Sequence, residues 1–422
     1  MKIVQINTVC GTGSTGKITV DLYHLAEQAG HDARIAYGRG SSPADVHSFK
    51  IGNTLDFGFH VLRNFCFGNS GFGSAAMTRR FLAWLDTVKP DILHFHNLHG
   101  FYIHVGMLFK YVKSHHIPIV WTFHDCWPLT GQCAHFDYAN CCKWRTACHH
   151  CPIYRSDYPY SLFRDNSRQN YILKKASFTG VKNMVIVTPS NWLAEIVSNS
   201  FLKEYPVKVI PNGINLEIFH PANGLTADSS SGTVNTPSAS KIILGVANVW
   251  TKRKGLDFFL QLSGMLNSPY HIVLIGLSKK QQSDIRSKYG SRITAITRTA
   301  DQSELASWYQ RACVYVNPTL EDNFPTTNLE SLACGTPVIT FDTGGSPECI
   351  TDKCGIVVEK GNISKLKDAV LSLDKMTEIT ALTCREQAMQ YNKDERFKKY
   401  LSIYESLYTH SSSLPAPESS YP

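Results

Sequence analysis

Two acidic side chains flank the predicted start of a helix in the C-terminal half of the chain. Asp322 and Glu330 stand eight residues apart, where a polar loop gives way to the apolar pattern of a helix. Backbone N–H groups at a helix start bind anions, and a carboxylate nearby can bind the hydroxyl groups of a ribose. The spacing therefore predicts a site for a phosphorylated ligand that carries hydroxyl groups.

A simpler interpretation of the same residues is structural. Thr327 and Glu330 have the spacing of a capping box, in which the two side chains satisfy the first backbone N–H groups of a helix. Asp322 would then only solvate a loop. The residues alone leave both interpretations open.

The elements around these acids form a βαβ unit. The pattern predicts a strand over 314–316, a polar loop over 319–325, a helix that ends at Gly335 and a second strand over 338–340. The carboxyl ends of parallel strands are where open α/β sheets bind ligands. The loop and the helix start are expected at that edge, and the turn at Gly344 follows the second strand there.

A cluster of cations precedes another predicted helix. Lys252, Arg253 and Lys254 follow a strand that begins at residue 242, and Gly255 separates them from the helix. Cations at a strand-to-helix turn suit a diphosphate, because the helix N-terminus adds its own attraction for an anion. The alternative is a charge run that is only solvated.

Glycines also follow the first strand of the chain, over 2–7. Gly11, Gly13 and Gly16 form a turn into a helix, and with Lys17 they imitate a phosphate-binding P-loop. Ile18 stands where that motif needs a Ser or Thr for magnesium. We therefore favour a glycine-rich turn at which the backbone approaches a ligand.

Histidines end two further predicted strands, over 91–97 and 118–124. His96 and Asn97 close the first, and His124 closes the second. Side chains at these strand ends face the ligand-binding edge of a parallel sheet. The alternative for each histidine is a structural residue with satisfied hydrogen bonds.

Residues 51–84 are rich in aromatic residues and glycine, and Arg79, Arg80, Phe81 and Trp84 follow the densest part. The first interpretation is a pair of helices packed over the first sheet. The second is a basic and aromatic surface that meets a membrane or a lipid-linked molecule.

Six of the thirteen cysteines lie between residues 126 and 151. Cys148 and Cys151, with Cys133 and either Cys141 or Cys142, have the number of ligands that a structural zinc ion needs. The set that we favour is Cys133, Cys142, Cys148 and Cys151. Packed, reduced thiols are the main alternative, and a disulfide is a further one.

Composition sets the class of protein. The 422 residues are too many for one core, and 43% hydrophobic with 18% charged residues is typical of globular domains. The net charge of +8 suits anionic ligands or an anionic membrane surface and does not indicate nucleic acid. The opening run is too short for a signal peptide, and no run approaches the ~20 apolar residues of a spanning helix. We expect a cytoplasmic protein with mostly reduced thiols.

The domain organisation follows from one change in composition. Residues 223–240 are rich in Ser, Thr, Gly and Ala and predict a flexible linker. We expect a first α/β domain over 1–222, with the cysteine-rich insertion over 126–151, and a second over 241–395. A helix over 396–409 can cross back to the first domain, and a disordered tail is expected over 410–422.

The ordered motifs resemble those of retaining glycosyltransferases with the GT-B fold. The stretch 314–345 is similar to their nucleotide-sugar signature, Lys254-Gly255 to their Lys-Gly pair, and IPNGIN (210–215) to their linker motif. HDCWPLTGQCAHF and CKWRTACHHCP resemble the branch that makes exopolysaccharides of the colanic-acid type. The family has Glu where this chain has Asp322, with Glu321 just before it, and Arg where it has Asn248.

The resemblance implies two Rossmann-like domains that face a cleft, with the donor in the second and the acceptor in the first. It implies retaining transfer of a hexose from a nucleotide-diphospho-sugar to a glycan or lipid-linked acceptor in surface polysaccharide synthesis. No cofactor for catalysis and no nucleic acid is implied, and peripheral contact with the inner face of a membrane is compatible with it. The residues expected in transfer are His124, Lys254, Arg253, Asp322 and Glu330. Those expected at the donor are Gly13, Gly16, Asn248, Arg298, Asn323, Phe324, Pro325 and Thr326, and those at the acceptor are His96 and Asn97.

Two other functions remain open at this point. A P-loop phosphotransferase would depend on Lys17 and not on Lys254. A protein that binds a nucleotide sugar without catalysis would keep the donor site, and the departures at Asp322 and Asn248 leave room for it.

Overall fold

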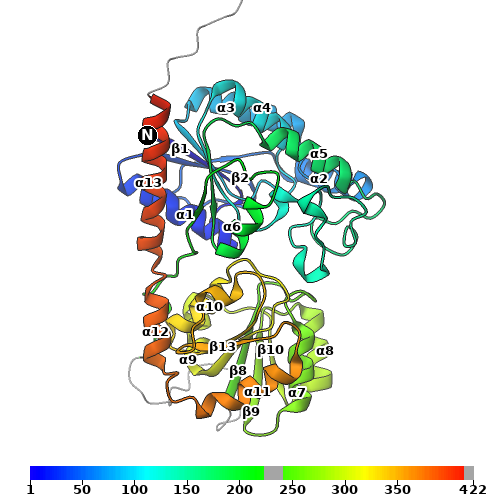
Figure 1. Ribbon diagram of the computed structural model, residues 1–422, viewed down its shortest axis with the longest axis vertical. Coiled ribbons are helices and arrows are strands. Elements are labelled where there is room, and N and C mark those ends of the chain that lie inside the picture. The colour runs from blue at the N-terminus through cyan, green and yellow to red at the C-terminus, as the bar shows by residue number, and fades with distance from the viewer. Residues whose placement is uncertain (223–240, 413–422) are drawn as a thin grey trace, which may run out of the picture. The chain divides into compact units, whose positions relative to one another are not determined.

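The structure is a computed structural model that describes residues 1–222 and 241–412 (Figure 1). These residues form two compact units: Met1–Ile210 together with the chain from Arg396, and Pro211–Glu395. Residues 211–222 thus belong to the second unit, although the composition places the boundary at 222. The predicted linker over 223–240 and tail residues 413–422 lie outside the described residues.

The first unit is built on a seven-stranded sheet in which all neighbouring strands are parallel, in the order β3-β2-β1-β4-β5-β6-β7. Apolar residues fill both faces of its central strands, as expected where helices cover both sides. The strands are β1 (Lys2–Val9), β2 (Asp32–Arg39), β3 (Ser48–Lys50), β4 (Ile92–Phe95), β5 (Ile119–Thr122), β6 (Met184–Thr188) and β7 (Val207–Val209).

Helices cover the two faces of this sheet. One hydrophobic core unites the sheet with α3 (Ala75–Val88), α4 (Val105–His115), α5 (Ser167–Phe178) and α6 (Asn191–Ser198). The other unites it with α1 (Gly13–Gln28) and the C-terminal helix α13 (Lys393–Ser412). Helix α2 (Thr54–Phe67) precedes α3, and the cysteine-rich segment forms the short 3-10 helices η1 (Trp127–Leu129), η2 (Asp137–Ala139) and η3 (Lys143–Arg145).

The second unit has a six-stranded parallel sheet in the order β10-β9-β8-β11-β12-β13. Its strands are β8 (Lys241–Val246), β9 (Tyr270–Ile275), β10 (Ile293–Ile296), β11 (Ala312–Asn317), β12 (Val338–Phe341) and β13 (Gly355–Val358). Helices α7 (Leu256–Met265), α8 (Lys279–Tyr289) and α11 (Ile363–Ser372) share one core with it, and α9 (Gln302–Arg311), α10 (Thr326–Ala333) and α12 (Ala381–Met389) share the other. The 3-10 helices are η4 (Ser346–Cys349) and η5 (Leu373–Lys375).

The predicted capping box at Thr327 and Glu330 is wrong. Helix α10 begins at Thr326, with Pro325 as its N-cap and no side-chain cap. Thr327 therefore lies inside the first turn, where it cannot act as the cap. The side chain of Glu330 accepts a hydrogen bond from the Tyr309 hydroxyl at 3.1 Å instead. The capping role of Glu330 is therefore ruled out.

The C-terminal helix α13 is part of the first unit's core. Phe397, Tyr400, Tyr404 and Leu407 are buried against the sheet and α1. Figure 1 shows this helix running beside α1 and β1. Residues 410–412 continue the helix, so the predicted disordered tail does not begin at 410. No helix within residues 1–222 and 241–412 is both long and apolar enough to cross a membrane.

Replacing Tyr404, which is 1% exposed, by Ala should destabilise the first unit by about 3–5 kcal/mol, because the change leaves a cavity in a packed core. Tyr404→Phe should cost only about 1 kcal/mol, the net value of one hydrogen bond. Urea unfolding measures both. Tyr408→Ala on the same helix, where the side chain is 42% exposed, is the matched control and should change stability by less than ~0.5 kcal/mol.

Candidate functional site

The candidate donor site lies at the switch point of the second unit's sheet. Strands β8 and β11 are neighbours there, and the chain leaves them toward α7 and α10 on opposite faces of the sheet. Ligands bind at such points because the connections diverge and leave the loops accessible. The predicted cations follow β8, and the predicted acids follow β11. The topology therefore brings together two groups that lie about seventy residues apart in the sequence.

An ion pair joins the two loops. Lys254 Nζ lies 2.5 Å from Asp322 Oδ2, and both side chains are partly exposed, at 26% and 18%. The other carboxylate oxygen, Oδ1, accepts the backbone N–H of Asn323 at 2.9 Å. A cation and an acid are thus held in contact at the surface of the site, where a ligand can reach both.

Close backbone packing fixes this pair. Gly255 has φ +79° and lies so near the next loop that a Cβ atom would come within 2.1 Å of the Pro318 carbonyl oxygen. The Arg253 guanidinium donates to the Glu321 carbonyl at 2.5 Å, and the Arg253 carbonyl accepts the Leu320 N–H at 2.7 Å. Only glycine permits this approach, so Gly255 sets the distance between the two loops.

The structure separates the two acids that the sequence left as alternatives. Glu321 is buried, at 1% exposure, and Asp322 is the one beside Lys254. Arg253 is half-buried, and its bond to the Glu321 carbonyl uses one of the five donors of a guanidinium. Asp322 and Lys254 are therefore the charged side chains that the loops present together.

A third loop, after β12, completes this edge. Gly344 has φ +57°, and a Cβ atom there would lie 2.0 Å from the Asp322 carbonyl oxygen. The Gly345 N–H donates to that same oxygen at 3.0 Å, and Thr343 Oγ1 donates to the Leu320 carbonyl at 2.8 Å. The loops after β8, β11 and β12 thus support one another.

The other predicted donor residues differ in how accessible they are. Asn248, after β8, and Arg298, after β10, are exposed, and Thr326 is half-buried at the start of α10. Asn323, Phe324 and Pro325 are buried. The Phe324 ring packs against Tyr391 with its centroid 5.7 Å away, so this side chain serves the core of the second unit.

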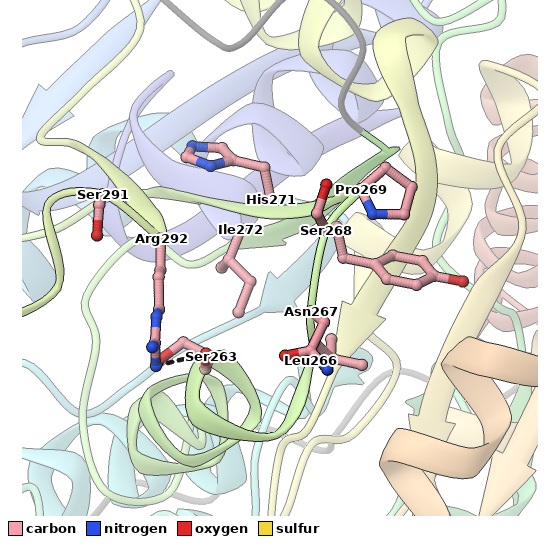
Figure 2. Close-up of a pocket in the computed structure, with 10 residues that line it drawn as sticks. Ser263, Leu266, Asn267, Ser268, Pro269, His271, Ile272, Ser291 and Arg292 are labelled. Atoms are coloured by element: carbon pink, nitrogen blue, oxygen red, sulfur yellow. Dashed lines mark hydrogen bonds between the residues drawn. The ribbon is translucent and has the colours of Figure 1, made fainter.

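A pocket in the second unit lies away from this site. It has a volume of about 380 Å³ and is lined by residues at the amino ends of β9 and β10, among them Tyr270, His271 and Arg292 (Figure 2). Arg292 points toward α7, where its guanidinium donates to the Ser263 carbonyl at 3.4 Å. The charged loops are at the opposite, carboxyl edge of the sheet, so this pocket is not the donor site.

In the first unit, a chain of hydrogen bonds connects the predicted histidines to the sheet. Gln5 Nε2 donates to the Thr19 carbonyl at 3.0 Å, and Gln5 Oε1 lies 3.1 Å from His96 Nε2. His96 Nδ1 in turn lies 3.0 Å from His124 Nε2, with the two rings stacked. His96 is buried and His124 is half-buried, so the chain runs from α1 and β1 to the end of β5.

This chain fixes the tautomers of both rings. Burial lowers the pKa of His124 to about 4 and that of His96 well below its ordinary value, so both rings are neutral near pH 7. Because Gln5 Oε1 is an acceptor, His96 donates from Nε2 and accepts at Nδ1. His124 then donates from Nε2. Its Nδ1 carries the lone pair and can accept a hydrogen bond from a hydroxyl group.

Helix α13 supports the histidines from behind. The Tyr404 hydroxyl lies 2.7 Å from His94 Nδ1, and His94 Nε2 lies 2.8 Å from Thr122 Oγ1. The His94 ring packs on His96 at 4.1 Å between centroids. Sequence reasoning missed His94, although its spacing of two residues from His96 in a strand places both side chains on one face.

A second pair, outside the predicted site residues, lies beside His124. His99 Nε2 is 2.7 Å from Asp125 Oδ2, and His99 Nδ1 is 3.0 Å from the Tyr158 hydroxyl. Burial raises the pKa of Asp125, but His99 outweighs it and the pKa falls to about 2. The carboxylate is therefore ionised. The signal in the sequence was Asp125 directly after His124 at a strand end.

The glycine-rich turn after β1 is a helix start. The Gly11 N–H donates to the Gly16 carbonyl at 3.0 Å, and α1 begins at Gly13, which has φ +65°. Gly16 is buried, with Val9 too close for a larger side chain to fit without displacement. Asn97 is half-buried, and its carbonyl accepts the Tyr102 hydroxyl at 2.8 Å.

The four predicted zinc ligands are not gathered into one centre. Cys133 and Cys148 are buried, Cys151 is half-buried, and Cys142 is exposed. A hydrogen bond with Cys133 lowers the pKa of Cys151, so those two thiols are neighbours. In the part of the chain that the structure describes, no group of three or more His, Cys, Asp or Glu side chains could hold a metal ion. Zinc binding stays a prediction.

Two parallel Rossmann-like sheets with these loops are the architecture of GT-B glycosyltransferases. Residues 16–218 match the family described as Glycosyltransferase Family 4, and residues 240–375 match the family described as Glycosyl transferases group 1. The two matches cover most of the chain. The protein therefore belongs to the GT-B glycosyltransferases and is an enzyme of that class.

Particular relatives agree with this assignment. A protein of Escherichia coli K12, named provisionally as the colanic acid biosynthesis glycosyl transferase WcaC, is 23% identical and covers 96% of this chain and 100% of its own. N,N'-diacetylbacillosaminyl-diphospho-undecaprenol alpha-1,3-N-acetylgalactosaminyltransferase of Campylobacter jejuni is 27% identical over 55% of this chain and 62% of its own. Sucrose-phosphate synthase of Thermosynechococcus elongatus shares the fold, with a TM-score of 0.70 and 16% sequence identity. The match covers 97% of this chain and 100% of the synthase chain.

Acidification should destabilise the first unit. Burial lowers the pKa of His94 to about 3, whereas an unfolded histidine titrates near 6.5, so only the unfolded state gains a proton between these values. Stability is complete above pH 6.5 and should fall by about 1.4 kcal/mol per pH unit for each such histidine as the pH drops toward 4. Urea unfolding of wild type and His94→Gln at pH 7.5, 6 and 5 measures this slope.

The His94→Gln variant should show a shallower slope, because one buried histidine is gone. His115→Gln, at a half-exposed side chain on α4, is the control. Its free energy of unfolding should depend on pH with the same slope as that of wild type. Equal slopes in wild type and His94→Gln would contradict a buried neutral ring.

Metal analysis of protein purified without added metal tests the cysteine segment. A zinc content near one per chain supports a structural ion, and replacement of Cys148 by Ser should then release it and lower the melting temperature. A content near zero removes the zinc prediction and leaves packed thiols.

Proposed function

We propose that this glycosyltransferase moves a hexose from a nucleotide-diphospho-sugar to a glycan or lipid-linked glycan in surface polysaccharide biosynthesis, with retention of the anomeric configuration. The contact between Lys254 and Asp322 at the switch point carries the donor half of this proposal. The names of the colanic acid relative and of the transferase that acts on a diphospho-undecaprenol support the class of acceptor.

The donor exchanges partners with the ion pair. Lys254 and Arg253 supply positive charge to the diphosphate, and Asp322 and Glu330 then accept hydrogen bonds from hydroxyl groups of the nucleotide and the sugar. A partly exposed pair suits this exchange, because surface ion pairs are worth at most about 1 kcal/mol and a doubly charged diphosphate competes with Asp322 for Lys254. The N–H groups at the start of α10 add attraction for the anion.

Transfer joins the acceptor oxygen to the anomeric carbon of the sugar as the bond from that carbon to the diphosphate breaks. The electron pair of the broken bond remains on the diphosphate, whose negative charge Lys254 and Arg253 stabilise. The hydroxyl proton leaves with the diphosphate, and no side chain acts as a nucleophile. In the first unit, His124 Nδ1 accepts a hydrogen bond from a sugar hydroxyl and so orients it, while His96 and Asn97 line the same edge.

Donor binding is tested by thermal shift with UDP-, GDP- and ADP-sugars, because a ligand that binds only the folded state raises the melting temperature. One class should shift wild type, and Lys254→Ala should weaken binding by about 10- to 100-fold, the value of a charge-assisted hydrogen bond. Glu330→Ala should also reduce the shift. The absence of any shift, or a full shift in both variants, would overturn the donor site.

Lys17→Ala is the matched control for Lys254→Ala. Lys17 is an exposed lysine at the only stretch of the chain that imitates a P-loop. Loss of nucleotide binding in this variant, with binding intact in Lys254→Ala, would favour the phosphotransferase instead.

Catalysis and stereochemistry need separate measurements. Slow hydrolysis of the donor in the absence of acceptor would argue against a protein that only binds nucleotide sugars. The anomeric proton coupling of the product, measured by NMR, should match that of the donor, and the opposite coupling would reject retention but not transfer. The proposal requires no cofactor for catalysis, so transfer should persist in EDTA.

A further inference from the structure

Helix α2 of the first unit exposes large apolar side chains and fully buries two polar ones. Leu55, Phe59 and Leu62 are 73%, 72% and 58% exposed, although they recur at the spacing of one helix face. The two side chains of α2 that are buried are the polar His60 and Asn64. A surface helix normally buries its apolar face and exposes its polar one, because exposed apolar area is unfavourable in water.

Hydrogen bonds hold the helix in this orientation. The Gly73 N–H donates to His60 Nε2 at 3.2 Å, so His60 donates from Nδ1 to Ser74 Oγ at 2.9 Å. Asn64 Nδ2 donates to the Tyr160 carbonyl at 2.8 Å. Rotating the helix to bury its apolar face would leave these buried polar groups without partners, which is costly.

The loop over residues 160–163, just before α5, enlarges the apolar surface. Phe67 at the end of α2 is 52% exposed, and Phe163 is 73% exposed. The loop is attached to α2, because the Leu162 N–H donates to the Phe65 carbonyl at 3.0 Å and Tyr160 stacks on Phe65 at 5.3 Å. We call this surface the α2 face and define it by Leu55, Phe59, Leu62, Phe67, Leu162 and Phe163.

A groove indents the α2 face. It has a volume of about 460 Å³ and lies between α2 and the first turn of α3, with Phe59, Leu62 and Phe67 on one side and Met77 on the other. Arg63 lines the same groove. The face therefore offers both side chains that can insert into an apolar phase and a recess that can receive an apolar chain.

The charges around the α2 face are predominantly positive. Exposed arginines lie on α2, in the loop before α5, on the first turn of α5 and on α3, namely Arg63, Arg164, Arg168, Arg79 and Arg80. Two carboxylates, Asp56 in the groove and Asp165 before α5, lie among them, so the arginines outnumber these acids; Asp56 accepts the Asn53 N–H at 3.0 Å, and Asp165 accepts the Cys151 N–H at 2.8 Å. Apolar side chains bordered by cations match a bilayer whose headgroups are anionic.

We propose that the α2 face docks the protein on the surface of a bilayer that contains anionic lipids. Phe59, Leu62, Phe67 and Phe163 enter the boundary between headgroups and acyl chains, and the arginines pair with lipid phosphates. A second copy of the chain would meet this face with a like-charged arginine border, which disfavours self-association. The α2 face contains none of the residues assigned to the donor chemistry. Membrane docking through this face can therefore be tested independently of the proposed function.

Co-sedimentation of the full-length protein with vesicles tests this interaction. Vesicles of phosphatidylcholine with 30% phosphatidylglycerol should bind the protein at least ~10-fold more tightly than pure phosphatidylcholine, and salt should weaken that binding. The double variant Phe59→Ser/Leu62→Ser should reduce partitioning at least ~10-fold, because two inserted side chains are lost. The double variant Arg63→Gln/Arg164→Gln should reduce the preference for anionic vesicles.

The control is Leu382→Ser/Met389→Ser on α12 of the second unit, at side chains that are 66% and 57% exposed. It removes similar apolar area from another surface and should bind vesicles as wild type does. Circular dichroism melts should show all variants folded, since the replaced side chains are exposed.

Equal binding by wild type and Phe59→Ser/Leu62→Ser, or an equal loss in the α12 control, would overturn the proposal. The proposal would also be overturned if the wild-type protein did not bind anionic vesicles. If light scattering then showed a dimer that Phe59→Ser/Leu62→Ser dissociates, the occupant of the α2 face would be a second copy of the chain.

Discussion

The candidate donor site depends on the contact between the loops that follow β8 and β11. These strands are neighbours at the switch point, so a cation from one loop and an acid from the next meet at the same sheet edge. Gly255 permits the contact, because any side chain there would collide with the Pro318 carbonyl. Gly344 has the same role beneath Asp322. Two glycines thus set the geometry of the ion pair on which the proposed donor site depends.

Hydrogen bonds position the candidate site residues of the first unit, whereas an ion pair positions those of the second. Gln5, His96 and His124 form a chain in which each ring has one possible tautomer, and burial keeps the rings neutral. Helix α13 extends the support, since the Tyr404 hydroxyl reaches His94 behind His96. A residue near the end of the chain therefore fixes side chains at the ends of strands β4 and β5. The neutral rings also explain why acid should destabilise this unit.

Much of the fold was predictable from local patterns. Short apolar runs that end in Gly, Pro, Asn or His marked the strands of both sheets, and the GT-B family and fold are confirmed. The cations at 252–254 and the acids at 322 and 330 were recognisable because each group follows a strand. The capping box was wrong because Pro325 already ends the loop, so the helix begins one residue before Thr327. The six clustered cysteines were visible, but their spacing says nothing of where each side chain points.

The sequence alone determined which residues lie at the carboxyl ends of the strands, because strand periodicity and the residues that break it are local properties. Only the tertiary structure decided which of those residues meet. Strand order brought the loop of Lys254 to the loop of Asp322, and packing that no local pattern encodes buries Glu321 and leaves Asp322 beside Lys254. The same holds for α2: its apolar residues were plain in the sequence. Their outward direction depends on the hydrogen bonds of His60 to the turn before α3 and of Asn64 to Tyr160, which is distant along the chain.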